Sequence, residues 1–125
     1  MANVTRKGRT RTPPFVMLEH RLIDSPAWAS LGGSAVKLLM LMARRYNGSN
    51  NGQMYLGERE AAEVIGLSRN TVASAFAELE AAGFIVAVER GHFHVKARIA
   101  TRWRLTFHST DNGPATHDYR AFPTA

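Results

Sequence analysis

At residues 58–84 the chain has the sequence EREAAEVIGLSRNTVASAFAELEAAGF, which predicts two short helices joined by a tight turn. Small and branched apolar residues recur at intervals of three and four on both sides of Gly66, so the two helices must pack on each other. The first helix is expected over 58–65, and Gly66 stands where it must stop, since a positive φ is cheap for glycine. Ser68 can then cap the next helix, and Gly83 can end it.

The second helix, expected over 69–82, has an outer face of short or hydrogen-bonding side chains and no carboxylate before Glu78. Such a face suits entry into the major groove of DNA, because acidic side chains would meet phosphate first. Arg69 and Asn70 are the predicted base readers, since arginine suits guanine and asparagine suits adenine. The predicted supporting contacts to phosphate or bases are Thr71, Ser74 and Ser68.

The segment 60–85 resembles the winged helix-turn-helix family of bacterial, phage or mobile-element regulators. The resemblance rests on the Gly-Leu-Ser turn, the Thr-Val pair that opens the second helix, and the Gly-Phe-Ile step that follows it. The pair Ala61-Ala62 before the turn departs from the family, which commonly has a larger aliphatic residue first. It covers roughly residues 34–107. It implies an α+β fold of three main helices with a small antiparallel β-wing, binding of double-stranded DNA, and no cofactor.

A β-wing is also predicted from the residues themselves. Strands are expected over 84–89 and 100–107, with Gly91 marking a turn. The second strand alternates, with Trp103, Leu105 and Phe107 on one face. The opposite face of this strand is expected to point outward and to carry Thr101, Arg102, Arg104 and Thr106. Between the strands, a long hairpin tip or an irregular loop is expected to contain His92, His94, Lys96 and Arg98.

Charge is concentrated at two places. The net charge is +6 and the pI is about 10.5, yet residues 57–89 are acidic overall. The basic side chains gather in the arm and the wing, which fits two phosphate clamps around a nearly neutral reading helix; the alternative is a basic surface that only keeps the domain soluble. The predicted DNA contacts are therefore Arg6, Lys7, Arg9 and Arg11 in the arm and Arg90, His92, His94, Lys96, Arg98, Arg102 and Arg104 in the wing.

Three segments follow from composition. Residues 1–14 form a flexible basic arm, which either lies in a minor groove or is a solvated tail. Residues 15–107 form the DNA-binding domain. Residues 108–125 form a tail, which is disordered or docks through Tyr119 and Phe122 on the core or on a neighbour.

Within the domain, residues 34–46 predict a helix that is apolar nearly all round and so belongs in the centre of the core. Ser25-Pro26 predicts a cap and a first helical position for one turn over 27–31, anchored by Trp28. Residues 15–18 are expected to form a strand or an anchoring segment. A short strand is expected over 53–56.

Several classes of protein are disfavoured. The absence of cysteine excludes disulfides and cysteine-based metal sites. No apolar run approaches a membrane span, and residues 1–14 lack the hydrophobic centre of a secretion signal, so a cytoplasmic, nucleoid-associated protein without membrane partners is expected. His92 and His94 form a His-x-His pair, but no further ligands complete a metal site. No catalytic motif is visible, so we expect a non-enzymatic protein.

The predicted function is sequence-specific binding of double-stranded DNA as a transcriptional regulator. Two alternatives remain at this level: an architectural or excisionase-like recombination factor, and a replication-origin-binding protein of a mobile element. A homodimer or cooperative assembly on DNA is expected where half-sites are paired. A winged module that binds only protein would predict a neutral surface without a basic wing.

Overall fold

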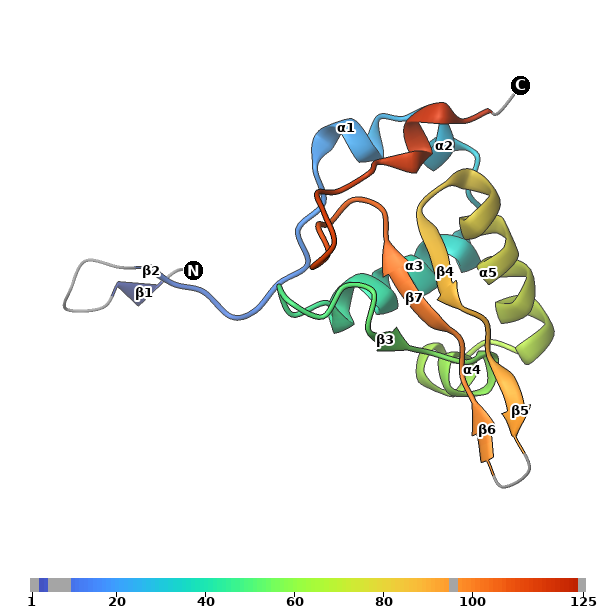
Figure 1. Ribbon diagram of the computed structural model, residues 1–125. Helices are drawn as coiled ribbons and strands as arrows, with labels where there is room; N and C mark the ends of the chain where they lie inside the picture. Colours follow the sequence, from blue (N-terminus) through green and yellow to red (C-terminus); the bar gives the residue numbers. More distant parts are fainter. Residues whose placement is uncertain (1–2, 5–9, 95–96, 124–125) are drawn as a thin grey trace.

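The structure is a computed structural model that describes residues 3–4, 10–94 and 97–123. The helices are α1 (His20–Ile23), α2 (Pro26–Ala29), α3 (Gly33–Arg45), α4 (Glu58–Ile65), α5 (Arg69–Ala82) and the 3-10 turn η1 (Asp118–Ala121). The strands are β1 (Asn3–Val4), β2 (Thr10–Arg11), β3 (Met54–Tyr55), β4 (Ile85–Glu89), β5 (His92–His94), β6 (Ala97–Ile99) and β7 (Arg102–Leu105). The three longer helices, α3 to α5, and a three-stranded sheet form the body (Figure 1).

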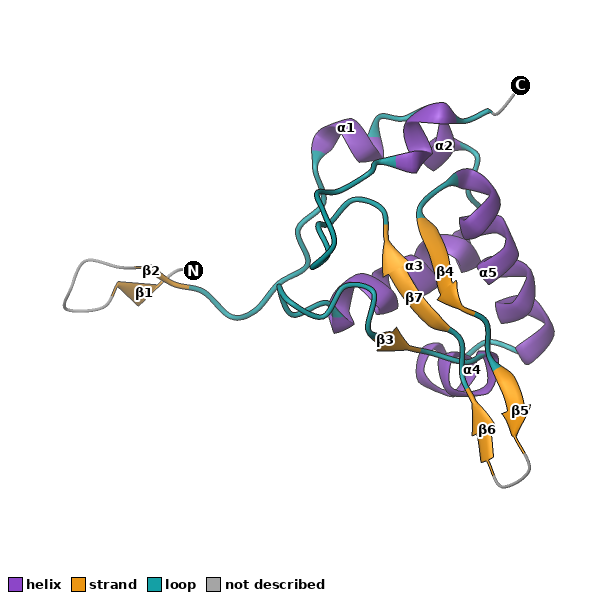
Figure 2. Cartoon of the chain, in the orientation of Figure 1, coloured by secondary structure: helices purple, strands orange, loops and turns teal. Residues whose placement is uncertain are grey.

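The main sheet is antiparallel, with strand order β3-β7-β4. Helices α3, α4 and α5 lie on one face of this sheet, and Figure 2 views it from the opposite face. Phe76 of α5 stacks on Trp103 of β7 with ring centroids 5.0 Å apart and an interplanar angle of 6°. This aromatic pair joins the second helix of the motif to the sheet. An α+β winged helix-turn-helix fold is confirmed.

Helix α3 is the centre of the core, as its sequence predicts. Leu38 and Leu39 are fully buried, and Met42 is nearly so. Ser25 caps the short helix before it by accepting a hydrogen bond from the Trp28 amide at 3.2 Å, with Pro26 at the first helical position. Both features follow the predicted pattern.

The boundaries of α4 and α5 also match the prediction. Gly66 ends α4 in the left-handed region with φ 72°. The Ser68 hydroxyl accepts from the Thr71 amide at 3.2 Å and so caps α5. Gly83 ends α5 with φ 88°. Local turn chemistry therefore fixes both helices.

Of the two expectations for the residues between the strands of the wing, the long hairpin tip is the one observed. Residues 92–94 and 97–99 pair as antiparallel strands β5 and β6, with His92 opposite Ile99. Gly91 is therefore not the hairpin turn. A Cβ on Gly91 would lie 2.7 Å from the Ile99 carbonyl oxygen, so a glycine here lets the two arms of the hairpin approach closely. The position of the turn is therefore the part of the wing that the sequence did not predict.

The alternation predicted over 100–107 is correct for Trp103, Leu105 and Phe107, which are buried, although strand β7 itself ends at Leu105. It is wrong for Thr106, which was expected outside and is fully buried. Its hydroxyl donates to the Gly83 carbonyl at 2.7 Å, and its own carbonyl accepts from the His117 amide at 2.8 Å. The tail covers this position, which strand periodicity alone could not show.

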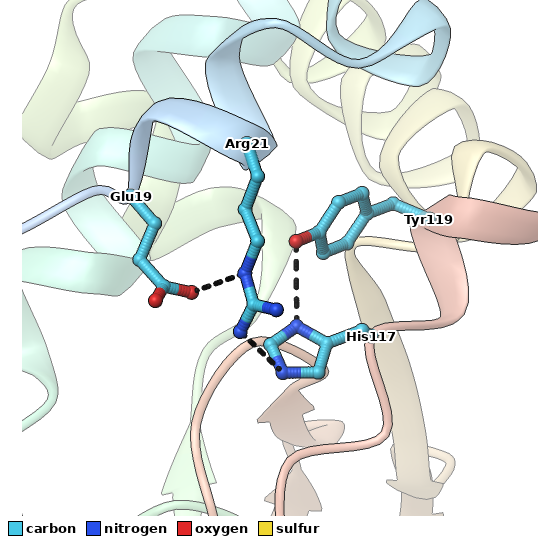
Figure 3. Close-up of polar contacts among 4 residues, drawn as sticks. All are labelled: Glu19, Arg21, His117 and Tyr119. Atoms are coloured by element: carbon cyan, nitrogen blue, oxygen red, sulfur yellow. Dashed lines mark hydrogen bonds and ion pairs between the residues drawn. The ribbon is translucent and has the colours of Figure 1, made fainter.

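Of the open expectations for the tail, docking on the core is the one observed. Tyr119 is 1% exposed and stacks on Phe84 with ring centroids 5.3 Å apart. His117 lies between Tyr119 and Arg21 of α1, within 3.3 Å of each (Figure 3). The tail is thus tied both to the core and to the first helix.

The amino-terminal segment approaches the body without forming a strand over 15–18. Val16 and Leu18 pack partly against the core, whereas Phe15 and Met17 are exposed, so this is an anchoring segment. Farther out, Asn3–Val4 pairs with Thr10–Arg11, away from the body (Figure 1).

Candidate nucleic-acid interface

The first turn of α5 is an exposed, polar end of a helix. Arg69, Asn70 and Ser74 are exposed, and Thr71 is half-buried. The Ser68 and Thr71 hydroxyls hydrogen-bond to each other at 2.9 Å, in addition to the capping bond. Two of the predicted supporting residues therefore hold the helix end in shape, while the arginine and asparagine side chains are left open to solvent.

The start of α5 and the root of the wing border the same groove. This wing groove has a volume of about 560 Å³. Arg69 lines it from the helix, and His92 and Thr101 line it from the hairpin. The Thr101 hydroxyl accepts from the Gly91 amide at 2.9 Å, which fixes the two arms of the hairpin at this level. The start of α5 and the root of the wing, which are far apart in the sequence, therefore lie next to each other in the fold.

A helix-turn-helix domain is also found by comparison with known families. Residues 29–85 match the family model described as a helix-turn-helix domain. The chain carries a helix-turn-helix domain. Such a domain indicates binding to DNA, and its matched residues run from the end of α2 to the first residue of β4. Comparisons with curated proteins and with solved structures give no match.

Arg59 also lines the wing groove of this helix-turn-helix domain, although it was not among the residues predicted from the sequence to contact DNA. It is exposed in the first turn of α4, between Glu58 and Glu60. Glu60 is paired with Arg45 at 2.7 Å, so part of the acidic charge at this edge is neutralised. The signal available in the sequence was a single basic residue at the start of the first motif helix.

Arg90 lies beside the helix-turn-helix domain in a pair with Glu80 of α5. Its guanidinium donates to both carboxylate oxygens, at 3.0 Å for the Nη1 bond, and lies 5.9 Å from the Trp103 ring centroid. The hydrogen bonds to Glu80 and the negative charge of the Glu80 carboxylate raise the pKa of Arg90 above its ordinary value. The Arg90 side chain is exposed, but the carboxylate of Glu80 already balances its charge. Arg90 is therefore a weaker candidate for binding a phosphate group.

Arg102 and Arg104 lie on the sheet face opposite α5, because they alternate with buried Trp103 and Leu105. Arg102 donates to the Gly52 carbonyl at 2.9 Å and lies 3.8 Å from Glu89. Arg104 donates to the Thr116 hydroxyl at 3.0 Å. The predicted basic wing is therefore divided, since these two arginines do not share a surface with the tip of α5.

The remaining predicted contacts are not placed. The side chains of His94 and Arg98, on the strands of the wing, and of Arg11 fall outside the described residues. So do Arg6, Lys7, Arg9 and Lys96 altogether. Their proposed roles remain sequence predictions.

Within residues 3–4, 10–94 and 97–123, no three His, Asp or Glu side chains are arranged to hold a metal ion. In the same ranges, none of the helices has the length and apolar character needed to cross a membrane.

Proposed function

We propose that this chain binds double-stranded DNA sequence-specifically and regulates transcription, without catalytic activity. The observation that carries the proposal is the exposed start of α5, where Arg69 lines the wing groove together with residues of the hairpin and Asn70 is exposed next to it. An α-helix fits the major groove, and these two residue types can form bidentate contacts to guanine and adenine. The hairpin β5-β6 would then contact the backbone or the minor groove.

The sequence-specific part of the proposal is tested by selecting bound sequences from random duplex DNA and footprinting the product. Enrichment of one short motif protected over a single major-groove segment is the expected result. Retention of all sequences alike would contradict it and favour an architectural factor. That rival also predicts bending, which a circular-permutation gel shift measures.

The arrangement of selected sites tests the assembly and its biological role. We propose a dimer or a cooperative assembly on DNA in the cytoplasm, associated with the nucleoid, and a palindromic site is then expected. Direct repeats would instead indicate head-to-tail loading, as at a replication origin of a mobile element. Sedimentation of the complex would give the number of chains on each site.

A further inference from the structure

The sheet face opposite the helices is hollowed into a second groove, separate from the wing groove. This outer groove lies between strands β4 and β7 on one side and the loop 110–116 on the other, and has a volume of about 450 Å³. Cavities that bind small molecules have volumes of about 300–1,000 Å³. The outer groove is therefore large enough for a small ligand.

Two arginines form the polar part of the outer groove. Arg102 and Arg104 are neighbours on the same face of β7, and both are half-buried. Arg102 is partly neutralised by Glu89, 3.8 Å away. Arg104 has only the neutral Thr116 hydroxyl as a partner among the described side chains, and no described carboxylate lies within 4 Å of it. A half-buried guanidinium of this kind favours an anionic partner that accepts from its remaining N–H groups.

The rest of the outer groove is apolar enough to hold a hydrophobic group. Val86 and Val88 line it from β4, and Pro114 lines it from the loop. Val88 is 43% exposed, so its side chain is accessible to a ligand in the groove. Asp111 also borders the groove, but it is exposed, so water screens its charge more than that of the arginines within.

The recessed position of the arginines decides between two kinds of anion. Arg102 and Arg104 are half-buried, and they are held within the groove by the Gly52 carbonyl and the Thr116 hydroxyl. A small anion can enter this recess, whereas the backbone of a duplex is too wide to follow it. We infer that the outer groove binds a small organic anion, a carboxylate or a phosphate monoester attached to an apolar or aromatic body. Arg104 would take the anionic group, and Val86 and Val88 would contact the body.

The test is to titrate the full chain, without DNA, with small anions and to monitor binding by amide NMR and calorimetry. Phenyl phosphate and benzoate separate the two anionic groups, and inorganic phosphate tests the need for an apolar body. The expected result is a saturable shift confined to residues 86–88, 102–104 and 110–116, with at least tenfold weaker binding of inorganic phosphate than of the better aromatic probe. Because no DNA is present, this result is independent of the proposed regulatory function.

Three variants sharpen the test. Arg104→Gln should weaken binding of the aromatic probe at least tenfold, and Val88→Asp should do the same from an exposed position that does not endanger folding. Arg44→Gln is the matched control, since Arg44 is exposed on α3, outside the groove. The inference is overturned if no probe shifts these amides at 10-fold molar excess and above, if Arg44→Gln weakens binding as much as Arg104→Gln, or if short duplex DNA occupies this groove in place of the α5 tip.

Discussion

Asn51 is a buried polar side chain that holds the carboxyl-terminal end of β7. Its amide oxygen accepts from the Leu105 amide at 2.7 Å, and its amide nitrogen lies 2.9 to 3.2 Å from the carbonyls of Leu105, His108 and Ser109. At 4% exposure it is shielded from water, so these backbone groups have few other partners. One side chain in a loop thus replaces a missing stretch of β-ladder.

Asn51→Ala should lower the free energy of unfolding by about 2–3 kcal/mol, because it leaves a buried amide and carbonyl without partners. Urea denaturation measures the change. Asn112→Ala, at an exposed position, is the control and should change stability by less than about 0.5 kcal/mol. Equal stability of the two variants would show that water replaces the Asn51 side chain.

At the scale of elements, two glycines end the motif helices in the same backbone region but in different surroundings. Nothing lies within 4 Å of a Cβ built on Gly66, whereas one on Gly83 would lie 2.7 Å from the backbone of Asp118 in the tail. Gly66 serves only the turn between α4 and α5. Gly83 also lets the tail pack against the end of α5.

Gly66→Ala should therefore cost about 1–2 kcal/mol, the penalty of a left-handed conformation. Gly83→Ala should cost about 1–3 kcal/mol more, since the added methyl overlaps the tail. Chemical denaturation gives both values, and limited proteolysis should cut residues 108–123 faster in Gly83→Ala alone. Similar costs and similar cleavage for both variants would mean that the tail does not depend on this contact.

The wing is predicted to act as a sequence-independent element. Arg98→Ala and Lys96→Ala should each weaken binding to every duplex alike and reduce the slope of log affinity against log salt by about one, because each removes one phosphate contact. Titrations at several salt concentrations measure this slope. An unchanged slope with lost sequence preference would assign these side chains to base contacts instead.

At the scale of the whole molecule, a polar cluster connects the two ends of the chain. Arg21 is paired with Glu19 at 3.0 Å and also lies 3.3 Å from Nε2 of His117 (Figure 3). Because arginine only donates, Nε2 must accept, which requires a neutral imidazole. Burial, followed by the charges of Arg120 and Arg21, lowers the pKa of His117. Burial also lowers the pKa of His108, which stacks on Tyr46 with ring centroids 4.0 Å apart.

Stability should consequently fall on mild acidification. A histidine with a lowered pKa in the folded state binds fewer protons there than in the unfolded chain, so its contribution is complete above about pH 6.5 and is lost as the pH falls through the lower folded-state value. The free energy of unfolding, measured in urea between pH 7.5 and 5, should decrease, and a His108→Gln, His117→Gln double variant should show a smaller decrease. A rise in stability toward pH 5 would contradict this assignment.

The parts of this fold that sequence predicts are those fixed by local chemistry. Gly66, Ser68 and Gly83 give the bounds of α4 and α5, and α3 follows from its apolar composition. Pairing across long separations was not predictable in the same way. The burial of Thr106 depends on a tail that folds back over it, and the division of the wing arginines depends on which sheet face α5 covers.

Base reading by α5 is tested most directly by the binding free energy of Arg69→Ala on a duplex selected by the unmutated chain and on an unrelated duplex. Arg44→Ala, another exposed arginine outside the motif, is the control. If the start of α5 reads bases, Arg69→Ala loses about 1–3 kcal/mol on the selected duplex and much less on the unrelated one. If Arg69→Ala binds the selected duplex as tightly and as selectively as the unmutated chain, α5 does not read that site through this residue, and the proposed mode of DNA recognition is wrong.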